Sequence, residues 1–229
     1  MQVKAVFCDI GGPIYCDENF VSAVLRALDD LRAESGQPPT DRATFRQIYD
    51  IIRTSQNGSL RTALAEEFLG GNARKVELHE RTREYWHHPP GTMYSDVLPF
   101  FRQLSGLVTI GVLANQEASV IDALRRDGLG DVIDVWGISA VVGHEKPSAE
   151  LFHWCLDQAG VGPGEAVHIG NRLDTDVRPA KALGLHTVWV LRGEAPDNPT
   201  PEQAAEPDVI TPGLDGLAER ILLWTEGKG

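Results

Sequence analysis

Asp9 and Lys146 are the two side chains in this 229-residue chain whose types and positions best suit covalent chemistry on an anion. Asp9 follows an apolar run, 3–8, and a carboxylate there can attack phosphorus or carbon and form an intermediate that water then cleaves. Lys146 lies near the start of an expected helix, where the helix dipole disfavours a cation unless an anion lies close by. Together they predict a site that holds an anionic group and presents a nucleophile to it.

Two further sets of residues offer groups that hold such an anion or a metal ion. Backbone and amide groups suited to the remaining oxygens of a phosphate are expected from Gly11, Gly12 and Asn115. Oxygen donors suited to a hard cation, or to orienting water, are expected from Asn171, Asp174 and Asp176. Each of these residues alone also fits a turn or a helix cap. A functional role therefore requires that they meet at one place.

The elements that precede these residues are expected to bring them together. Short apolar runs that stop at Gly, Pro or polar residues are typical of buried strands, and they cover 3–8, 107–113, 132–142, 166–169 and 186–191. Helical spacing of apolar residues lies between them, at 118–126, 149–158 and 177–183. This alternation predicts an α/β fold, a Rossmann-like parallel sheet flanked by helices, in which ligands bind at the carboxyl ends of the strands.

Residues 16–90 differ, because their pattern is helical throughout. Helices are expected at 20–33, 41–53, 59–68 and 72–86, with Ser59 and Asn72 as caps of the last two. We therefore predict a helical domain over 16–90 inserted into a core of 1–15 and 91–229. Within the insert, Arg61 is a candidate substrate contact, although it fits equally well as an exposed residue of a helix start. Residues 193–208 are expected to form an exposed loop before a last helix at 214–224.

Composition narrows the classes of partner. The formal net charge is −12, from 33 acidic and 21 basic residues, with no block of Lys or Arg. Nucleic acid and anionic membranes are therefore not expected as partners, whereas a small phosphorylated molecule is compatible. No signal peptide or membrane helix is expected, and the three cysteines, Cys8, Cys16 and Cys155, suit a reducing cytosol. We expect a cytoplasmic protein that acts on a small molecule; its oligomeric state is left open.

Four segments in order resemble the motifs of the haloacid dehalogenase-like superfamily: 7–14, 111–115, 145–147 and 169–176. The helical insert resembles the C1-type cap of that superfamily. The resemblance implies a hydrolase in which Asp9 is the nucleophile and Lys146 and Asp176 are catalytic partners. It also implies a Mg²⁺ site formed by Asp9, the Gly11 carbonyl and Asn171, to which Asp174 or Asp176 adds a carboxylate.

Three positions depart from the pattern of the phosphatases in this superfamily. Gly11 stands where they carry a second Asp as general acid and base, Ala114 where they carry Thr or Ser, and Asn171 where an Asp ligates magnesium. Loss of general acid–base catalysis is typically worth ~10²–10⁴-fold, and least for a good leaving group such as an anomeric or acyl phosphate. Substitute proton donors are sought at Asp17, Glu18, or near His87 and His88.

Three functions follow from these observations. The first is a Mg²⁺-dependent phosphatase of a small phosphorylated metabolite that works through an aspartyl-phosphate on Asp9. The second is a metal-independent hydrolase like the 2-haloacid dehalogenases, which share the losses at positions 11 and 171 but carry Tyr instead of Gly11 and a Ser-Ser-Asn segment that is absent here. The third is a catalytically degenerate relative that binds a ligand or a protein partner.

Overall fold

The structure is a computed structural model that describes residues 3–225. The chain divides into two compact units, one formed by the segments up to Cys16 and from Pro89 onward, the other by Asp17–His88. The first unit is an α/β domain and the second is helical. The expected α/β fold, with a helical insert between the first two strands, is confirmed.

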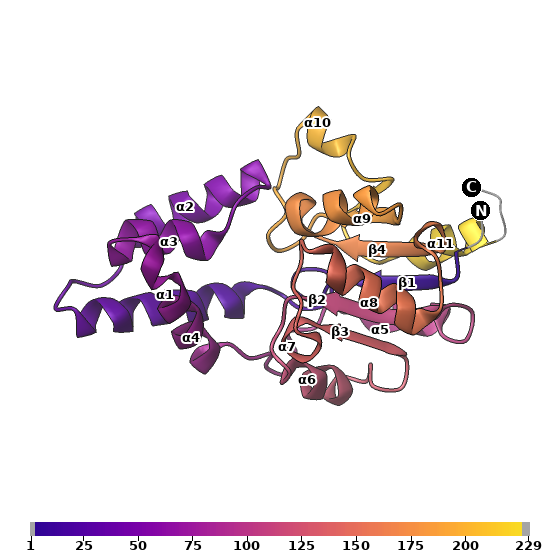
Figure 1. Ribbon diagram of the computed structural model, residues 1–229, viewed down its shortest axis with the longest axis horizontal. Coiled ribbons are helices and arrows are strands. Elements are labelled where there is room, and N and C mark those ends of the chain that lie inside the picture. The colour runs from indigo at the N-terminus through magenta and orange to yellow at the C-terminus, as the bar shows by residue number, and fades with distance from the viewer. Residues whose placement is uncertain (1–2, 226–229) are drawn as a thin grey trace. The chain divides into compact units, whose positions relative to one another are not determined.

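Six parallel strands form the sheet of the α/β unit, in the order β3-β2-β1-β4-β5-β6. Figure 1 labels β3, β2, β1 and β4, which follow one another in this order. Their bounds are Ala5–Cys8 (β1), Thr109–Ala114 (β2), Val135–Ile138 (β3), Ala166–Gly170 (β4), His186–Val190 (β5) and Val209–Thr211 (β6). The strands are almost continuously apolar because helices cover both faces of the sheet. The strand order reverses between β1 and β4, and the crevice at such a switch point is the usual place for a ligand. Asp9 directly follows β1 at that point.

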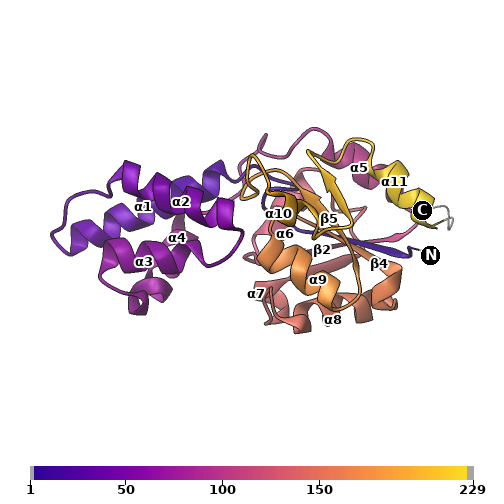
Figure 2. The ribbon, with the colours of Figure 1, turned by 90° about the horizontal axis from the view of Figure 1, so that it is seen from above.

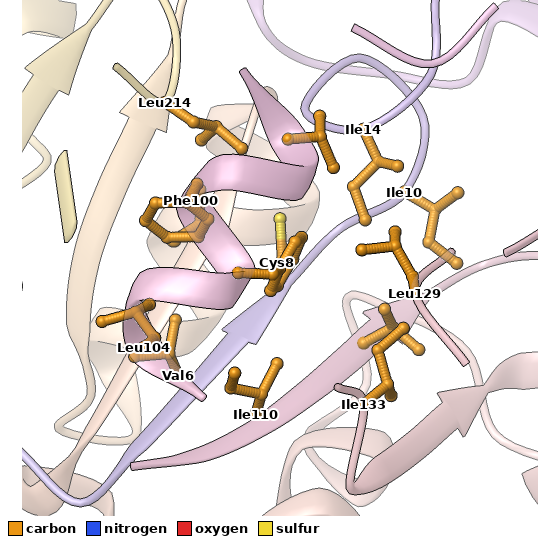
Figure 3. Close-up of a cluster of buried hydrophobic side chains, with 14 of the residues drawn as sticks. Val6, Cys8, Ile10, Ile14, Phe100, Leu104, Ile110, Leu129, Ile133 and Leu214 are labelled. Carbon is orange, nitrogen blue, oxygen red and sulfur yellow. The ribbon is translucent and has the colours of Figure 1, made fainter. Parts of the chain in front are cut away.

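Alternate residues of β1 pack on opposite faces of the sheet. Val6 and Cys8 belong to the cluster under α5 (Val97–Leu104) and α11 (Leu217–Thr225), part of which Figure 3 shows. Ala5 and Phe7 belong to a separate cluster with α8 (Ala149–Ala159). Figure 2 shows α5 and α11 on one side of the sheet and α8 on the other. Burial of both faces holds β1, and therefore the position of Asp9, in the middle of the domain.

The remaining elements of the α/β unit are short. They are α6 (Val120–Arg126), α7 (Ser139–Val142), a 3₁₀ turn (Pro163–Glu165), a π-helical turn (Leu173–Val177), α9 (Arg178–Ala182) and α10 (Pro201–Ala204). No helix in the described part of the chain, 3–225, is long and apolar enough to cross a membrane.

The helical unit contains α1 (Glu18–Glu34), α2 (Arg42–Ser55), α3 (Leu60–Leu69) and α4 (Lys75–Tyr85). Its core includes Leu28, Leu64 and Leu78, all fully buried. Ser59 caps α3 as expected, because its side chain accepts a hydrogen bond from the Thr62 amide. The expected cap at Asn72 is wrong, since Asn72 lies inside a 3₁₀ turn, Asn72–Arg74, that precedes α4.

Two expectations for the α/β unit need correction, and one helix lies where none is predicted. The β-branched run 132–142 contains a strand only at Val135–Ile138, after which the chain turns into α7 and exposes Val141. The expected loop 193–208 contains α10, which Thr200 caps. The helix α5 lies in a segment for which no element is predicted, although its buried apolar residues, Val97, Phe100, Phe101 and Leu104, repeat at helical spacing.

Candidate active site

A buried ammonium joins the two most important carboxylates of the expected site. Lys146 Nζ lies 2.9 Å from Asp9 Oδ1 and 2.6 Å from Asp176 Oδ1. The side chains of Lys146 and Asp176 are 3% and 0% exposed, whereas that of Asp9 is 14% exposed. Asp9 is therefore the member of this group that solvent, or a substrate, reaches.

Asp9 and Lys146 are each held in place through their backbones. The Asp9 amide donates to the carbonyl of Ile169, so the end of β1 is fastened to β4. Asn115, at the end of β2, accepts from the Lys146 amide at 2.7 Å and donates to the Lys146 carbonyl at 2.8 Å. The observed role of Asn115 is thus to hold the Lys146 loop, while its contact with substrate stays a prediction.

Asp176 lies in the π-helical turn and folds back onto the end of β4. Its Oδ2 accepts from the Arg172 amide at 3.0 Å, and its Oδ1 lies 3.1 Å from His168 Nε2 as well as near Lys146. A Cβ at Gly170 would lie 2.3 Å from the Cβ of Asp176, so only glycine permits this approach. His168 is not among the predicted site residues; its position in an otherwise apolar strand, two residues before the Gly-Asn turn, is the signal in the sequence that points to it.

The charges of this group follow from burial and from the lysine. Burial raises the pKa of Asp9 to about 6, although Lys146 acts in the opposite direction. Burial also disfavours the charged forms of Lys146 and Asp176, but here mutual attraction prevails: the pKa of Lys146 is raised and that of Asp176 is lowered. Near neutral pH the lysine is therefore a cation between two carboxylates, and Asp176 stays ionised.

Of the side chains expected to hold a metal, Asp174 bonds to Arg172, whereas Asn171 lies against the loop that follows Asp9. Both oxygens of Asp174 bond to the Arg172 guanidinium, at 2.9 and 2.7 Å, rather than to the group around Asp9. Asn171 donates through its side-chain nitrogen to the Arg192 carbonyl. A Cβ at Gly12 would lie 2.1 Å from that same nitrogen, which shows that Asn171 lies directly against the loop after Asp9.

The oxygen groups offered by the residues of this loop and by the side chain packed against it are the Asp9 carboxylate, the Gly11 carbonyl and the side-chain oxygen of Asn171. Within 3–225 no cluster of three or more His, Cys, Asp or Glu side chains could hold a metal. Mg²⁺ commonly binds through one or two carboxylates together with water and substrate phosphate oxygens. The donor set fits such an ion, with a single charged ligand.

The remaining expected residues are divided between the two units. The amide of Gly12 donates to the Tyr15 carbonyl, whereas the Gly11 amide makes no hydrogen bond within the described chain. Arg61 belongs to the helical unit, where its guanidinium lies 5.5 Å from the centre of the Phe20 ring. The sought proton donors also belong to that unit: Asp17, Glu18, His87 and His88.

Comparisons with known proteins agree with this geometry. A family model described as haloacid dehalogenase-like hydrolase matches residues 3–184. A glyceraldehyde 3-phosphate phosphatase of Methanopyrus kandleri is 26% identical over 211 residues, 86% of this chain and 87% of that protein. A phosphoserine phosphatase of Thermus thermophilus is 37% identical over 151 residues, 63% of this chain and 56% of that protein.

A solved structure shares the whole fold. The HAD-hydrolase YfnB of Bacillus subtilis, bound to magnesium, superposes with a TM-score of 0.67 at 19% identity, over 96% of this chain and 99% of that one. At this identity the likeness concerns the fold alone. Because the family model spans most of the sequence, from the first strand to beyond the fourth motif, the chain belongs to the haloacid dehalogenase-like hydrolases.

Proposed function

We propose that this protein is a phosphatase of a small phosphorylated metabolite, with Asp9 as the nucleophile. The observation that carries the proposal is the Asp9–Lys146 pair, in which a buried ammonium holds a carboxylate that is still accessible. An oxygen of Asp9 attacks phosphorus, the bond to the leaving oxygen breaks, and an aspartyl-phosphate forms. Water then attacks this intermediate, which releases phosphate and restores the carboxylate. The two phosphatase relatives named above support a small phosphorylated substrate.

Lys146 has a defined part in both steps. Its ammonium lies against Asp9 and neutralises negative charge that collects where the phosphoryl group is transferred. Both oxygens of Asp176 are hydrogen-bonded, so Asp176 keeps the Lys146 ammonium in position and is not free to bind a metal ion directly. We therefore assign Asp176 to Lys146 rather than to the metal.

Mg²⁺ is proposed as the cofactor, held by Asp9, the Gly11 carbonyl and the Asn171 side-chain oxygen. When bound, the ion supplies additional positive charge to the transferring phosphoryl group. With only one carboxylate among the three donors, we expect affinity for the ion to be lower than in a site with two.

The leaving group is proposed to need little help from a proton donor. Gly11 has no side chain, and within residues 3–225 the Asp9–Lys146 side-chain pair is joined only by the Asp176 carboxylate, which stays ionised and has no proton to give. An anomeric or acyl phosphate departs as a comparatively stable anion, so it depends least on general acid catalysis. We therefore expect such phosphates to be hydrolysed faster than phosphates of ordinary alcohols.

The test offers acetyl phosphate, a hexose 1-phosphate and p-nitrophenyl phosphate to the purified full chain, with Mg²⁺ and with chelator. Phosphate release that needs Mg²⁺ and falls at least about 10³-fold in Asp9→Asn supports the proposal. The matched control is Asp122→Asn, because the Asp122 side chain is 87% exposed and should not affect turnover. If Asp9→Asn releases phosphate as fast as an active parent does, the proposed nucleophile is contradicted.

Two other outcomes identify the alternative functions. Release of halide from 2-haloacids that is insensitive to chelator would favour a dehalogenase-like hydrolase. Because Asp9 supplies the single carboxylate among the proposed metal donors, the assay also tests for hydrolysis that needs no metal ion. If the parent and Asp9→Asn are both inactive on every substrate, a ligand- or partner-binding relative is the better description.

A further inference from the structure

His168 is a buried histidine that the proposed mechanism leaves without a role. It lies in β4, 1% exposed, with its ring edge-on to Phe152 at a centroid distance of 5.2 Å. Nε2 lies 3.1 Å from Asp176 Oδ1, whereas Nδ1 is buried with no hydrogen-bond partner. One nitrogen of the ring thus bonds to the site, and the other is buried without a hydrogen-bond partner.

Packing alone does not account for a histidine at this position. A buried polar atom without a partner costs free energy that an apolar side chain of similar size would not. The hydrogen bond to Asp176 is charge-assisted, and bonds of this kind are the stronger ones in proteins. It therefore offsets the cost of the bare Nδ1, and it is the one hydrogen bond that the His168 ring makes in the described chain.

The contact also determines which ring nitrogen carries the proton. Asp176 is ionised, so the hydrogen bond requires a proton on Nε2, and Nδ1 is then an acceptor with nothing to accept. Burial lowers the pKa of His168, which agrees with a neutral ring. His168 therefore acts as a fixed hydrogen-bond donor rather than as a charge.

Three donors hold the Asp176 carboxylate. Lys146 Nζ and His168 Nε2 share Oδ1, and the Arg172 amide binds Oδ2. Removal of the His168 donor leaves the carboxylate held on one side only by the lysine itself. The carboxylate can then turn, and the ammonium that it holds 2.9 Å from Asp9 can move with it.

We propose that His168 is a positioning residue whose Nε2–H orients Asp176 and thereby holds the Lys146 ammonium against Asp9. The inference rests on the proposed phosphatase function for its effect on turnover. The hydrogen-bond chain that carries it runs from β4 through the π-helical turn to the loop after α7. His168 does not touch Asp9, so it acts through Asp176.

The kinetic test compares His168→Leu, which removes the donor, with His168→Gln, whose side-chain NH₂ can take the place of Nε2–H. With acetyl phosphate we expect kcat to fall about tenfold to a hundredfold in the Leu variant and no more than about threefold in the Gln variant. His186→Leu, on the neighbouring strand, is the control, and thermal unfolding confirms that each variant folds. Equal losses in the Leu and Gln variants, or no loss in the Leu variant, overturn the proposal.

A second measurement needs no turnover. In protein labelled with nitrogen-15 lysine, a buried ammonium exchanges its protons slowly and gives an observable signal, which Lys146→Met assigns. We expect this signal to persist in His168→Gln and to exchange at least about tenfold faster in His168→Leu. If the parent hydrolyses no phosphate, the phosphatase proposal fails, and this spectrum alone decides whether His168 positions Lys146. An unchanged signal in His168→Leu overturns the positioning role.

Discussion

Replacing Asp9 by Asn is expected to stabilise the folded protein while it removes the proposed nucleophile. The Asp9 side chain is 14% exposed, and its pKa is raised to about 6 because burial disfavours the carboxylate more than Lys146 favours it. An Asp in an unfolded chain has a pKa of about 3.9. The folded state therefore binds this proton more tightly than the unfolded state, and the ionised carboxylate opposes folding at neutral pH.

The magnitude follows from the two pKa values. A difference of about 2 units, at about 1.36 kcal/mol per unit, amounts to about 3 kcal/mol near pH 7. Asn is neutral and close in shape to the protonated carboxyl, so it should remove much of this penalty. We expect the free energy of unfolding to rise by about 1–3 kcal/mol, and Tm by about 3–10 °C for a chain of this size.

The gain in stability of Asp9→Asn is expected to depend on pH. As pH falls through about 6, Asp9 of the folded parent takes up its proton and the penalty shrinks; below about pH 4 the unfolded chain is protonated as well and the penalty is gone. The advantage of Asp9→Asn should therefore be largest at pH 7 and above, and small near pH 4. Lys146 stays charged in both the parent and Asp9→Asn, because Asp176 raises its pKa, so its own ionisation does not change the difference in stability between them.

The matched variant is Asp176→Asn, the same chemical change at the other carboxylate of Lys146. Burial alone would raise the pKa of Asp176, but Lys146 and His168 lower it by more than burial raises it. The ionised form of Asp176 therefore supports folding. This support is present above about pH 4 and is lost as pH falls through the lower, folded-state pKa. Removing a partner from a buried ion pair typically costs about 3–5 kcal/mol, so we expect a loss of that order.

Urea unfolding of the parent and both variants, followed by circular dichroism in the presence of chelator, measures the effect at about pH 7.5, 6 and 4.5. Opposite shifts for the two variants, with the gain of Asp9→Asn fading toward acid, are the expected result. If Asp9→Asn is less stable than the parent at pH 7.5, or if its gain does not change with pH, the electrostatic reasoning is refuted.

Three further changes test separate parts of the site. Asn115→Ala removes both hydrogen bonds to the Lys146 backbone and should lower kcat about tenfold or more, with a loss of about 1–3 kcal/mol in urea unfolding; near-parental values on both measures would contradict the clamp. Gly170→Ala places a Cβ 2.3 Å from that of Asp176, so we expect a loss of at least about 2 kcal/mol in unfolding and of most activity, and a variant as stable as the parent would count against this packing. Asn171→Asp adds a carboxylate to the proposed metal donors and should lower the half-saturating Mg²⁺ concentration roughly tenfold in a phosphate-release titration, whereas an unchanged or higher value would argue against Asn171 as a ligand.

The sequence by itself determined the fold and the pairing at the centre of the site. Apolar runs that end at polar residues identified β1 and β4, and the helical spacing after β1 identified the insert. The dipole argument for Lys146 predicted an anion partner, and the structure provides Asp9 and Asp176. These predictions succeeded because strand ends in a parallel sheet lie at one edge, whatever the details of the loops.

Only the tertiary structure decided what the other polar residues contact. Asp174 and Asp176 are two residues apart, yet the π-helical turn sends one to Arg172 and the other into the core against His168. Asn115 bonds to the backbone of a residue 31 positions later. Such contacts depend on side-chain direction within irregular turns and on the distance between separate loops, and hydrophobic periodicity carries information about neither.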